Sequence, residues 1–281
     1  MALHPTYIIE EKSSILHTER EIICSILFGR SYISYVFSNP ERTAIYLVKH
    51  FDLQNQVLGK SDFDEMLFDL FIKKALSVRL AIDSQKVSLM PSKHSKKLGP
   101  DFFATLFEQW PEEAVYQQNA SADCQLFYSL KKKTVEFLQQ RIQDLILVDS
   151  TLPLLKIYPE YCNRDCPVNL FIAVKEEHFY LTVLNEDSSF SLHQSHPYQQ
   201  AEDVLFSVAQ VIFNMQAQAD SVGIQIHGEV SSTDSVIELL RSYYPGTRPM
   251  RRIKSLQYPE ELFQHPSYYF FNLFALVSCE L

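Results

Sequence analysis

The feature that most constrains the fold is an order of predicted elements that occurs twice along the chain. Apolar runs and turn residues predict strand, strand, strand, helix, strand in a first copy, at residues 22–28, 32–38, 43–51, 61–74 and 76–82. The second copy repeats this order at residues 168–174, 179–185, 190–195, 201–219 and 223–226. Because a helix joins each meander of three strands to a fourth strand, the sequence predicts two duplicated α/β domains.

The local sequence supports these elements. Residues 22–28 read IICSILF, an isoleucine-rich apolar run that is too short for a helix, which indicates a buried strand. Ser61 is a candidate N-cap for the helix 61–74, and acidic residues in its first turn favour the helix dipole. The helix 201–219 has one apolar face, formed by Val204, Leu205, Val208, Val211, Ile212 and Met215. These patterns are typical of helices that pack on a sheet.

The segments outside the two copies complete the predicted organisation. Between the copies we expect a strand, a helix, a strand and a helix, at residues 123–130, 131–143, 144–150 and 151–162. After the second copy we expect a helix over 233–245, a short strand near 249–254 and an aromatic C-terminus that packs against one of the domains. We therefore expect a first domain at residues 1–150 and a second at residues 151–281.

Composition and charge exclude several classes of protein. The net charge of −9 argues against wholesale nucleic-acid binding, because affinity for phosphate backbones comes from clustered lysine and arginine. No apolar run approaches the roughly 18 residues of a membrane-spanning helix, and the N-terminus lacks the basic flank and apolar core of a signal peptide. Five scattered cysteines are typical of a reducing compartment. We therefore expect a soluble, cytoplasmic protein with no membrane span.

The ligand-type residues predict no metal site. Cys162 and Cys166 lie close together in YCNRDCP, but a zinc site needs a second such pair or two well-spaced histidines. His193 and His196 have no acidic or thiol residues nearby in the sequence. No serine lies in a GxSxG motif either. We therefore assign no catalytic residue and no metal ligand.

Three segments carry a resemblance to a known family. They are residues 26–51, which contain the first hairpins, residues 169–215, which contain the second set of hairpins and a long helix, and residues 223–245, a strand, a glycine and a helix. Together they resemble a bacterial family of unknown function whose members have an actin-like ATPase (ribonuclease H-like) fold. The resemblance covers roughly residues 20–281. It implies two actin-like domains, each a mixed sheet with a three-stranded antiparallel meander plus crossover helices, and no established activity.

The resemblance also implies where a nucleotide would bind. In actin-like ATPases the first hairpin of each domain binds phosphates through small residues, an acidic residue positions magnesium, and a glycine-rich third loop holds the adenosine. In this chain the corresponding candidates are Gly29, Arg30 and Ser31 in the first hairpin and Gly228 and Ser231 in the third loop. ATP or ADP is the cofactor that such a site would take.

These loops depart from the pattern of the superfamily. The strand before Gly29 has no acidic residue, the hairpin 175–178 (KEEH) has no Gly, Ser or Thr, and the third loop has one glycine. Arg30 at a hairpin tip is typical of a solvated side chain, and residues 231–235 are typical of an N-cap cluster for the next helix. The acidic residues that a nuclease of the related fold needs on its first strand are absent as well. The nucleotide cleft is therefore expected to be degenerate.

We predict a non-catalytic binding or scaffold protein with no cofactor and with another protein as its partner. The alternative is a divergent nucleotide-binding ATPase of the actin-like superfamily. A third hypothesis, nucleic-acid binding, rests on the basic segment RPMRRIK, whose cations are Arg248, Arg251, Arg252 and Lys254. The same segment also fits an edge strand that charge protects from aggregation.

Overall fold

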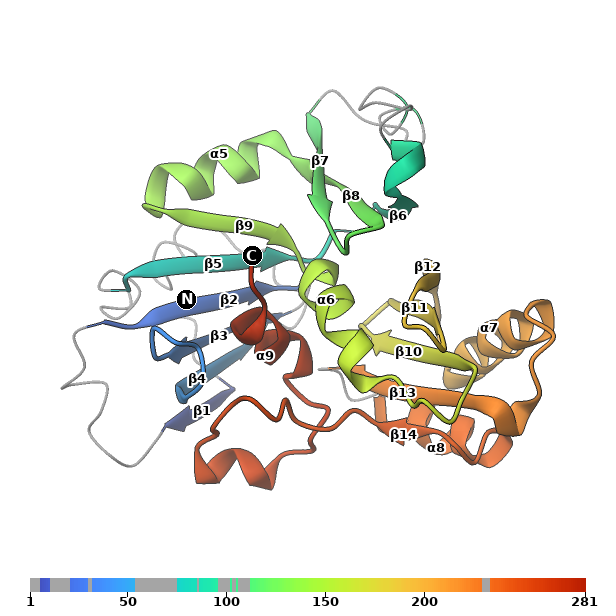
Figure 1. Ribbon diagram of the computed structural model, residues 1–281. Coiled ribbons are helices and arrows are strands. Elements are labelled where there is room, and N and C mark those ends of the chain that lie inside the picture. The colour runs from blue at the N-terminus through green and yellow to red at the C-terminus, as the bar shows by residue number, and fades with distance from the viewer. Residues whose placement is uncertain are drawn as a thin grey trace.

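The chain folds into three β-sheets with helices between and around them (Figure 1). The computed structural model describes residues 6–10, 21–29, 32–53, 75–84, 86–95, 102, 105, 112–228 and 233–281. This mixture of strands and helices confirms the predicted α/β class. The helix predicted over 61–74 lies outside the described residues. Among the described helices, none is both long and apolar enough to cross a lipid bilayer.

The first sheet contains six strands in the order β1-β4-β3-β2-β5-β9. They are β1 (Tyr7–Glu10), β2 (Ile23–Phe28), β3 (Tyr32–Ser38), β4 (Ile45–Asp52), β5 (Ser77–Ile82) and β9 (Leu145–Asp149). The strands β2, β3 and β4 form the predicted antiparallel meander, and β5 and β9 extend the sheet parallel to β2. All of β3 and almost all of β2 are buried, which explains their continuous apolar sequences.

The second sheet has the order β12-β11-β10-β13-β14. Its strands are β10 (Val168–Val174), β11 (His178–Asn185), β12 (Phe190–Pro197), β13 (Val222–Gly228) and β14 (Arg248–Pro249). The strands β10, β11 and β12 form an antiparallel meander, and β13 and β14 continue parallel to β10. The strand order and directions therefore match those of β4-β3-β2-β5-β9 in the first sheet. The strand predicted near 249–254 is shorter than expected, since the chain turns away from β13 after Pro249.

A third, antiparallel sheet lies beside these two and has the order β6-β8-β7. It is formed by β6 (Val87–Pro91), β7 (Glu113–Asn119) and β8 (Cys124–Lys131). The sequence predicted only the strand over 123–130, which corresponds to β8, and did not predict β6, β7 or β1. These missed strands have few or no buried residues, so their sequences lack the apolar runs that identify a strand.

The helices for which both ends are described are five in number, and two short 3-10 helices accompany them. The helices are α5 (Lys132–Arg141), α6 (Thr151–Tyr161), α7 (Ala201–Asn214), α8 (Thr233–Tyr243) and α9 (Phe271–Ser278). The 3-10 helices are η1 (Ala219–Ser221) and η2 (Glu260–Gln264). The helix predicted over 201–219 ends at Asn214, because Gln216 adopts a left-handed backbone with φ of 53° that cannot continue a right-handed helix.

The helices α6 and α9 lie between the two mixed sheets (Figure 1). Every residue of α9 from Phe271 to Val277 is buried, and the helix contacts β2 and β3 of the first sheet as well as α6 and β13. The C-terminal residues are then fixed by two arginines, because Arg42 and Arg79 both donate hydrogen bonds to the carbonyl oxygen of Cys279, at 2.6 and 2.7 Å. The aromatic C-terminus thus contacts both sheets, and the division near residue 150 stays a prediction.

Candidate functional site

The candidate site is the seam where the two mixed sheets meet. On the first sheet, β5 is followed by Asp83 and Ser84, and β9 ends at Asp149. On the second sheet, β10 is followed by Lys175, and β13 ends at Gly228. The carboxyl ends of parallel strands are where open α/β sheets bind ligands. The seam is therefore the place to look for chemistry.

Lys175 crosses this seam from the second sheet to the first. The residue is 2% exposed. Its Nζ atom lies 3.8 Å from the Asp83 Oδ1 atom and donates a hydrogen bond to the Tyr32 hydroxyl at 3.3 Å. Its own carbonyl oxygen accepts a hydrogen bond from Tyr198. A buried ion pair therefore joins the end of β10 to the end of β5.

The sequence KEEH of the hairpin 175–178 is typical of an acidic turn on a solvated edge, and the structure corrects this interpretation in part. Glu176 and Glu177 are exposed as expected, but Lys175 is buried. Sequence reasoning missed its role because a lysine beside two glutamates in a turn is usually solvated. One signal was available: Lys175 follows directly after VNLFIAV, a strand that is apolar on both faces.

Two buried acidic residues lie on the first-sheet side of the seam. Asp83 Oδ1 accepts a hydrogen bond from the Ser150 hydroxyl at 2.8 Å and lies 3.4 Å from the Tyr180 hydroxyl oxygen. The carboxyl group of Asp149 accepts from the backbone N–H groups of Thr151 at 2.8 Å and Ser84 at 3.1 Å. Burial raises the pKa of Asp149 to about 7, and these hydrogen bonds partly oppose the increase.

A second layer of polar side chains closes the seam. Tyr180 donates its hydroxyl to the carbonyl oxygen of Ser84 at 2.7 Å, so this β11 side chain also reaches the first sheet. Deeper in the seam, the Tyr158 hydroxyl and the Nε2 atom of His227 lie 2.7 Å apart. Burial holds the pKa of His227 well below its usual range, and the charge of Lys175 lowers it further. Several polar groups on the two sides of the seam thus hydrogen-bond to one another, although among the described residues the Nδ1 atom of His227 and the hydroxyl of Thr151 have no hydrogen-bond partner.

The structure places two of the predicted nucleotide-binding residues beside this network. Gly29 follows β2, and a Cβ atom there would lie 2.5 Å from the Tyr32 ring, which also contacts Lys175. Gly228 ends β13 next to Val174, the residue before Lys175. The other three candidates, Arg30, Ser31 and Ser231, lie outside the described residues.

Gly228 has a structural reason to be glycine. A Cβ atom there would lie 2.5 Å from the carbonyl oxygen of Val174, which is backbone and cannot move without disturbing the pairing of β10 with β13. We expect Gly228→Ala to lower the free energy of unfolding by about 1–3 kcal/mol. Urea unfolding measures this loss. Gly246→Ala is the control, since its nearest contact would be 3.2 Å, and a loss at Gly228 no larger than at Gly246 would contradict the prediction.

The four cations of the basic segment have two different environments in the structure. Arg248, Arg251 and Lys254 are exposed and line a pocket of about 670 Å³. Arg252 instead donates hydrogen bonds to the carbonyl oxygens of Leu262 and His265, both at 2.7 Å. Three of the four cations therefore point toward a surface pocket, and the fourth holds η2 in place.

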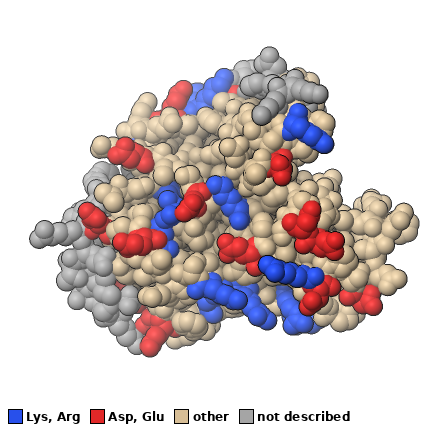
Figure 2. Space-filling view, viewed as in Figure 1, with Lys and Arg blue, Asp and Glu red and all other residues tan. Residues whose placement is uncertain are grey.

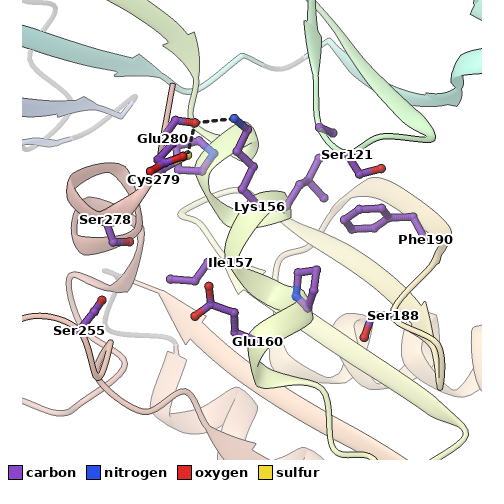
Figure 3. Close-up of a pocket in the computed structure, with 14 residues that line it drawn as sticks. Ser121, Lys156, Ile157, Glu160, Ser188, Phe190, Ser255, Ser278, Cys279 and Glu280 are labelled. Atoms are coloured by element: carbon purple, nitrogen blue, oxygen red, sulfur yellow. Dashed lines mark hydrogen bonds between the residues drawn. The ribbon is translucent and has the colours of Figure 1, made fainter.

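This basic pocket adjoins a second pocket of about 590 Å³ on the outer face of α6 (Figure 3). Figure 3 shows α6 between Ser188 and Phe190 on one side and Ser255 and Ser278 on the other. Lys156 of α6 donates to the carbonyl oxygen of Glu280 within this second pocket. Neither pocket includes the seam residues described above.

The ligand-type residues considered in the sequence have local partners. Cys166 Sγ accepts a hydrogen bond from Asn163 at 3.1 Å. His193 Nδ1 lies 2.9 Å from the Thr182 hydroxyl, and His196 stacks on Phe179. Within the described ranges there is no group of three or more His, Cys, Asp or Glu side chains that could hold a metal ion.

Comparison with known proteins places the fold. A Bacteroides thetaiotaomicron protein, described as having an actin-like ATPase fold and unknown function, aligns with a TM-score of 0.77 and 13% identity over 94% of this chain and 98% of that one. The PilM–PilN type IV pilus biogenesis complex contains a chain that aligns with a TM-score of 0.63 and 13% identity, over 92% of this chain and 98% of that one. The fold is therefore actin-like, as the resemblance implied.

Sequence comparison gives the family. No curated protein matches the sequence significantly. The family described as "Protein of unknown function (DUF3822)" matches residues 11–246, well over half of the chain, which confirms the expected domain of unknown function. Because this match covers most of the chain, the chain belongs to the DUF3822 family.

Proposed function

We propose that this protein is a non-catalytic binding or scaffold protein in the cytoplasm, with a degenerate nucleotide cleft and another protein as its partner. The observation that carries this proposal is the buried ion pair between Lys175 and Asp83, which fills the seam from the side of the second hairpin. The seam is held together by the chain's own side chains.

Phosphate binding at the seam would disturb this network. A phosphate group needs donors that are not already engaged, and the Lys175 ammonium group lies against Asp83 and Tyr32. The carboxyl groups of Asp83 and Asp149 would repel the phosphate charge when ionised. Entry of a nucleotide would therefore separate a buried ion pair, which costs several kcal/mol when one charge is left alone.

One observation favours the alternative, a divergent nucleotide-binding ATPase. The seam combines a lysine with two carboxyl groups at the carboxyl ends of the strands, and phosphoryl-transfer sites use a lysine for phosphates and an acidic residue for magnesium. In that function Lys175 would exchange Asp83 for a phosphate oxygen, and Asp83 or Asp149 would hold the metal ion. The two functions predict opposite responses to nucleotide.

A thermal shift assay with ATP, ADP and magnesium separates the two. We expect no change in Tm, although a ligand at 100 times its Kd would stabilise the folded state by about 2.7 kcal/mol. The proposal would be overturned if ATP raised the Tm saturably in the wild type and in Lys86→Met but not in Lys175→Met. Lys86 is the control because it also pairs with an acid, Glu113, at a more exposed position.

Two observations support a protein as the partner. On α7, the side chains of Phe206 and Phe213 are 71% and 80% exposed, and residues seven apart lie on the same face of a helix. Exposed apolar patches commonly mark protein interfaces. The structural neighbour PilM belongs to a complex with PilN, which is also consistent with a protein partner for this chain.

The cysteines bear on the proposed compartment. The five cysteines form no disulfide, in keeping with a reducing compartment such as the cytoplasm.

A further inference from the structure

The outer face of α6 carries one continuous groove made of the two pockets, which share Glu160 and Ser255. We call it the α6 groove. Its first part is bounded by the β7–β8 turn at Ser121, the β11–β12 turn at Ser188 and Phe190, and the C-terminal residues (Figure 3). Its second part runs past Tyr161 and the start of β13 to the basic segment.

The second part of the α6 groove is positively charged. Arg248, Arg251 and Lys254 line it, all three exposed, and in the described part of the chain none of their side chains forms an ion pair or donates a hydrogen bond. Glu160 is the acidic residue in the same lining. Figure 2 shows several blue side chains close together in the lower part of this face, with red ones beside and above them. A local excess of positive charge in a chain of net charge −9 points to an anionic ligand.

The first part of the α6 groove is mixed in character. Phe190 and Pro159 are its partly exposed apolar residues, and the lining also includes Lys156, Glu160, Glu280 and several serines. The Phe190 ring lies beside α6 in Figure 3. The groove therefore offers a small apolar contact at one end and three cations at the other, which fits an extended peptide that combines an apolar residue with a neighbouring run of acidic ones.

A nucleic acid fits the α6 groove less well than a peptide. Single-stranded nucleic acids need accessible aromatic rings on which bases stack. The one aromatic ring in the basic part is Tyr161, which packs edge-on against Phe271 and donates its hydroxyl to the Arg252 carbonyl oxygen. The net charge of −9 would also repel a long polyanion.

We propose that the α6 groove is the docking site for an extended acidic peptide segment of a partner protein. Carboxylates of the peptide pair with Arg248, Arg251 and Lys254, and its apolar side chain lies against Phe190 and Pro159. The proposal rests on the proposed function in one respect, that the partner is a protein. It does not depend on whether the seam binds a nucleotide.

The test is a selection of random peptides displayed on phage against the full chain, followed by fluorescence anisotropy with the selected peptides. We expect enrichment of peptides in which a run of Asp or Glu lies next to an apolar residue. The triple variant R248Q/R251Q/K254Q should weaken their binding at least tenfold, which is about 1.4 kcal/mol. The matched control K131Q/K132Q/K133Q removes the same charge from exposed lysines at the start of α5 and should leave the Kd unchanged.

Other outcomes overturn the proposal. These are selected peptides without acidic residues, an equal loss of binding in both triple variants, or a labelled single-stranded RNA that binds through Arg248, Arg251 and Lys254 while the acidic peptides do not bind. Phe190→Ala tests the apolar part separately and should also weaken binding. Because none of these residues lies at the seam, an ATP-induced shift would refute the proposed function and leave this test unaffected.

Discussion

Replacing Lys175 with methionine is expected to lower the free energy of unfolding by about 3–5 kcal/mol. The variant keeps the apolar part of the side chain but removes a charge whose side chain is 3% exposed, and it leaves the Asp83 carboxylate, 6% exposed, without its cation. Asp83 would retain only the hydroxyl groups of Ser150 and Tyr180. An uncompensated buried charge is among the few single-site changes with so large an effect.

The matched control is Lys86→Met. Lys86 pairs with Glu113 at 2.8 Å, a shorter distance than in the buried pair, but its side chain is 30% exposed. The pair is partly buried, with the Glu113 side chain 14% exposed, so removing this cation should cost about 1 kcal/mol, the upper end of the range for exposed pairs. Urea unfolding of both variants at pH 7 makes the comparison, and equal losses would refute a special role for the seam.

The strands of the two mixed sheets could be predicted because burial on both faces leaves a continuous apolar run. Residues 168–174 were predicted as a strand and form β10 with the same bounds, and every residue of β10 is buried. The strands that were missed, such as β7, are half-exposed and carry polar residues. The strand predicted over 123–130 exists, but its membership of a separate sheet depends on pairing with β6 and β7, which local sequence does not determine.

The sequence led to two residues beside the candidate site but not to the side chains that form it. The superfamily pattern led to Gly29 and Gly228, and both lie at strand ends beside the seam. The pattern gave no reason to notice Lys175 or Asp83, because the two residues are distant in sequence and each follows a strand in a turn-like segment. Whether a lysine after a strand is solvated or buried depends on which residues of the other mixed sheet lie opposite it. In the same way, Arg252 differs from Arg251 only through the carbonyl groups of η2 that lie within its reach.

His50 should make the protein sensitive to acid. The side chain lies on β4, 4% exposed, with Nδ1 2.7 Å from the Ser34 hydroxyl. Four aromatic rings surround it, those of Tyr7, Tyr32, Tyr269 and Phe270. Burial lowers the pKa of His50 from 6.5 to about 4, although Asp52 raises it in part. The His50 side chain therefore binds a proton less readily in the folded protein than in the unfolded chain.

The sign and size of the effect follow from this difference. Between pH 6.5 and about 4, the unfolded state binds more protons at His50 than the folded state, so the free energy of unfolding falls as the pH falls. The contribution is complete above pH 6.5 and is lost as the pH drops toward 4, and it amounts to about 3 kcal/mol. Other buried histidines with lowered pKa values, such as His227, add to the same decline.

A double variant isolates the contribution of His50. His50→Phe suits the aromatic surroundings and removes the titrating group, and Ser34→Ala removes the hydroxyl that would otherwise lose its partner. Urea unfolding gives the free energy of unfolding at pH 7 and at pH 4. Its decrease from pH 7 to pH 4 should be smaller by about 3 kcal/mol in H50F/S34A than in the wild type. The exposed His94, changed to glutamine, is the control and should leave the decline unchanged. If the free energy of unfolding of H50F/S34A falls with pH as steeply as that of the wild type, His50 takes up a proton as easily in the folded protein as in the unfolded chain. In that case the aromatic surroundings do not exclude the charge.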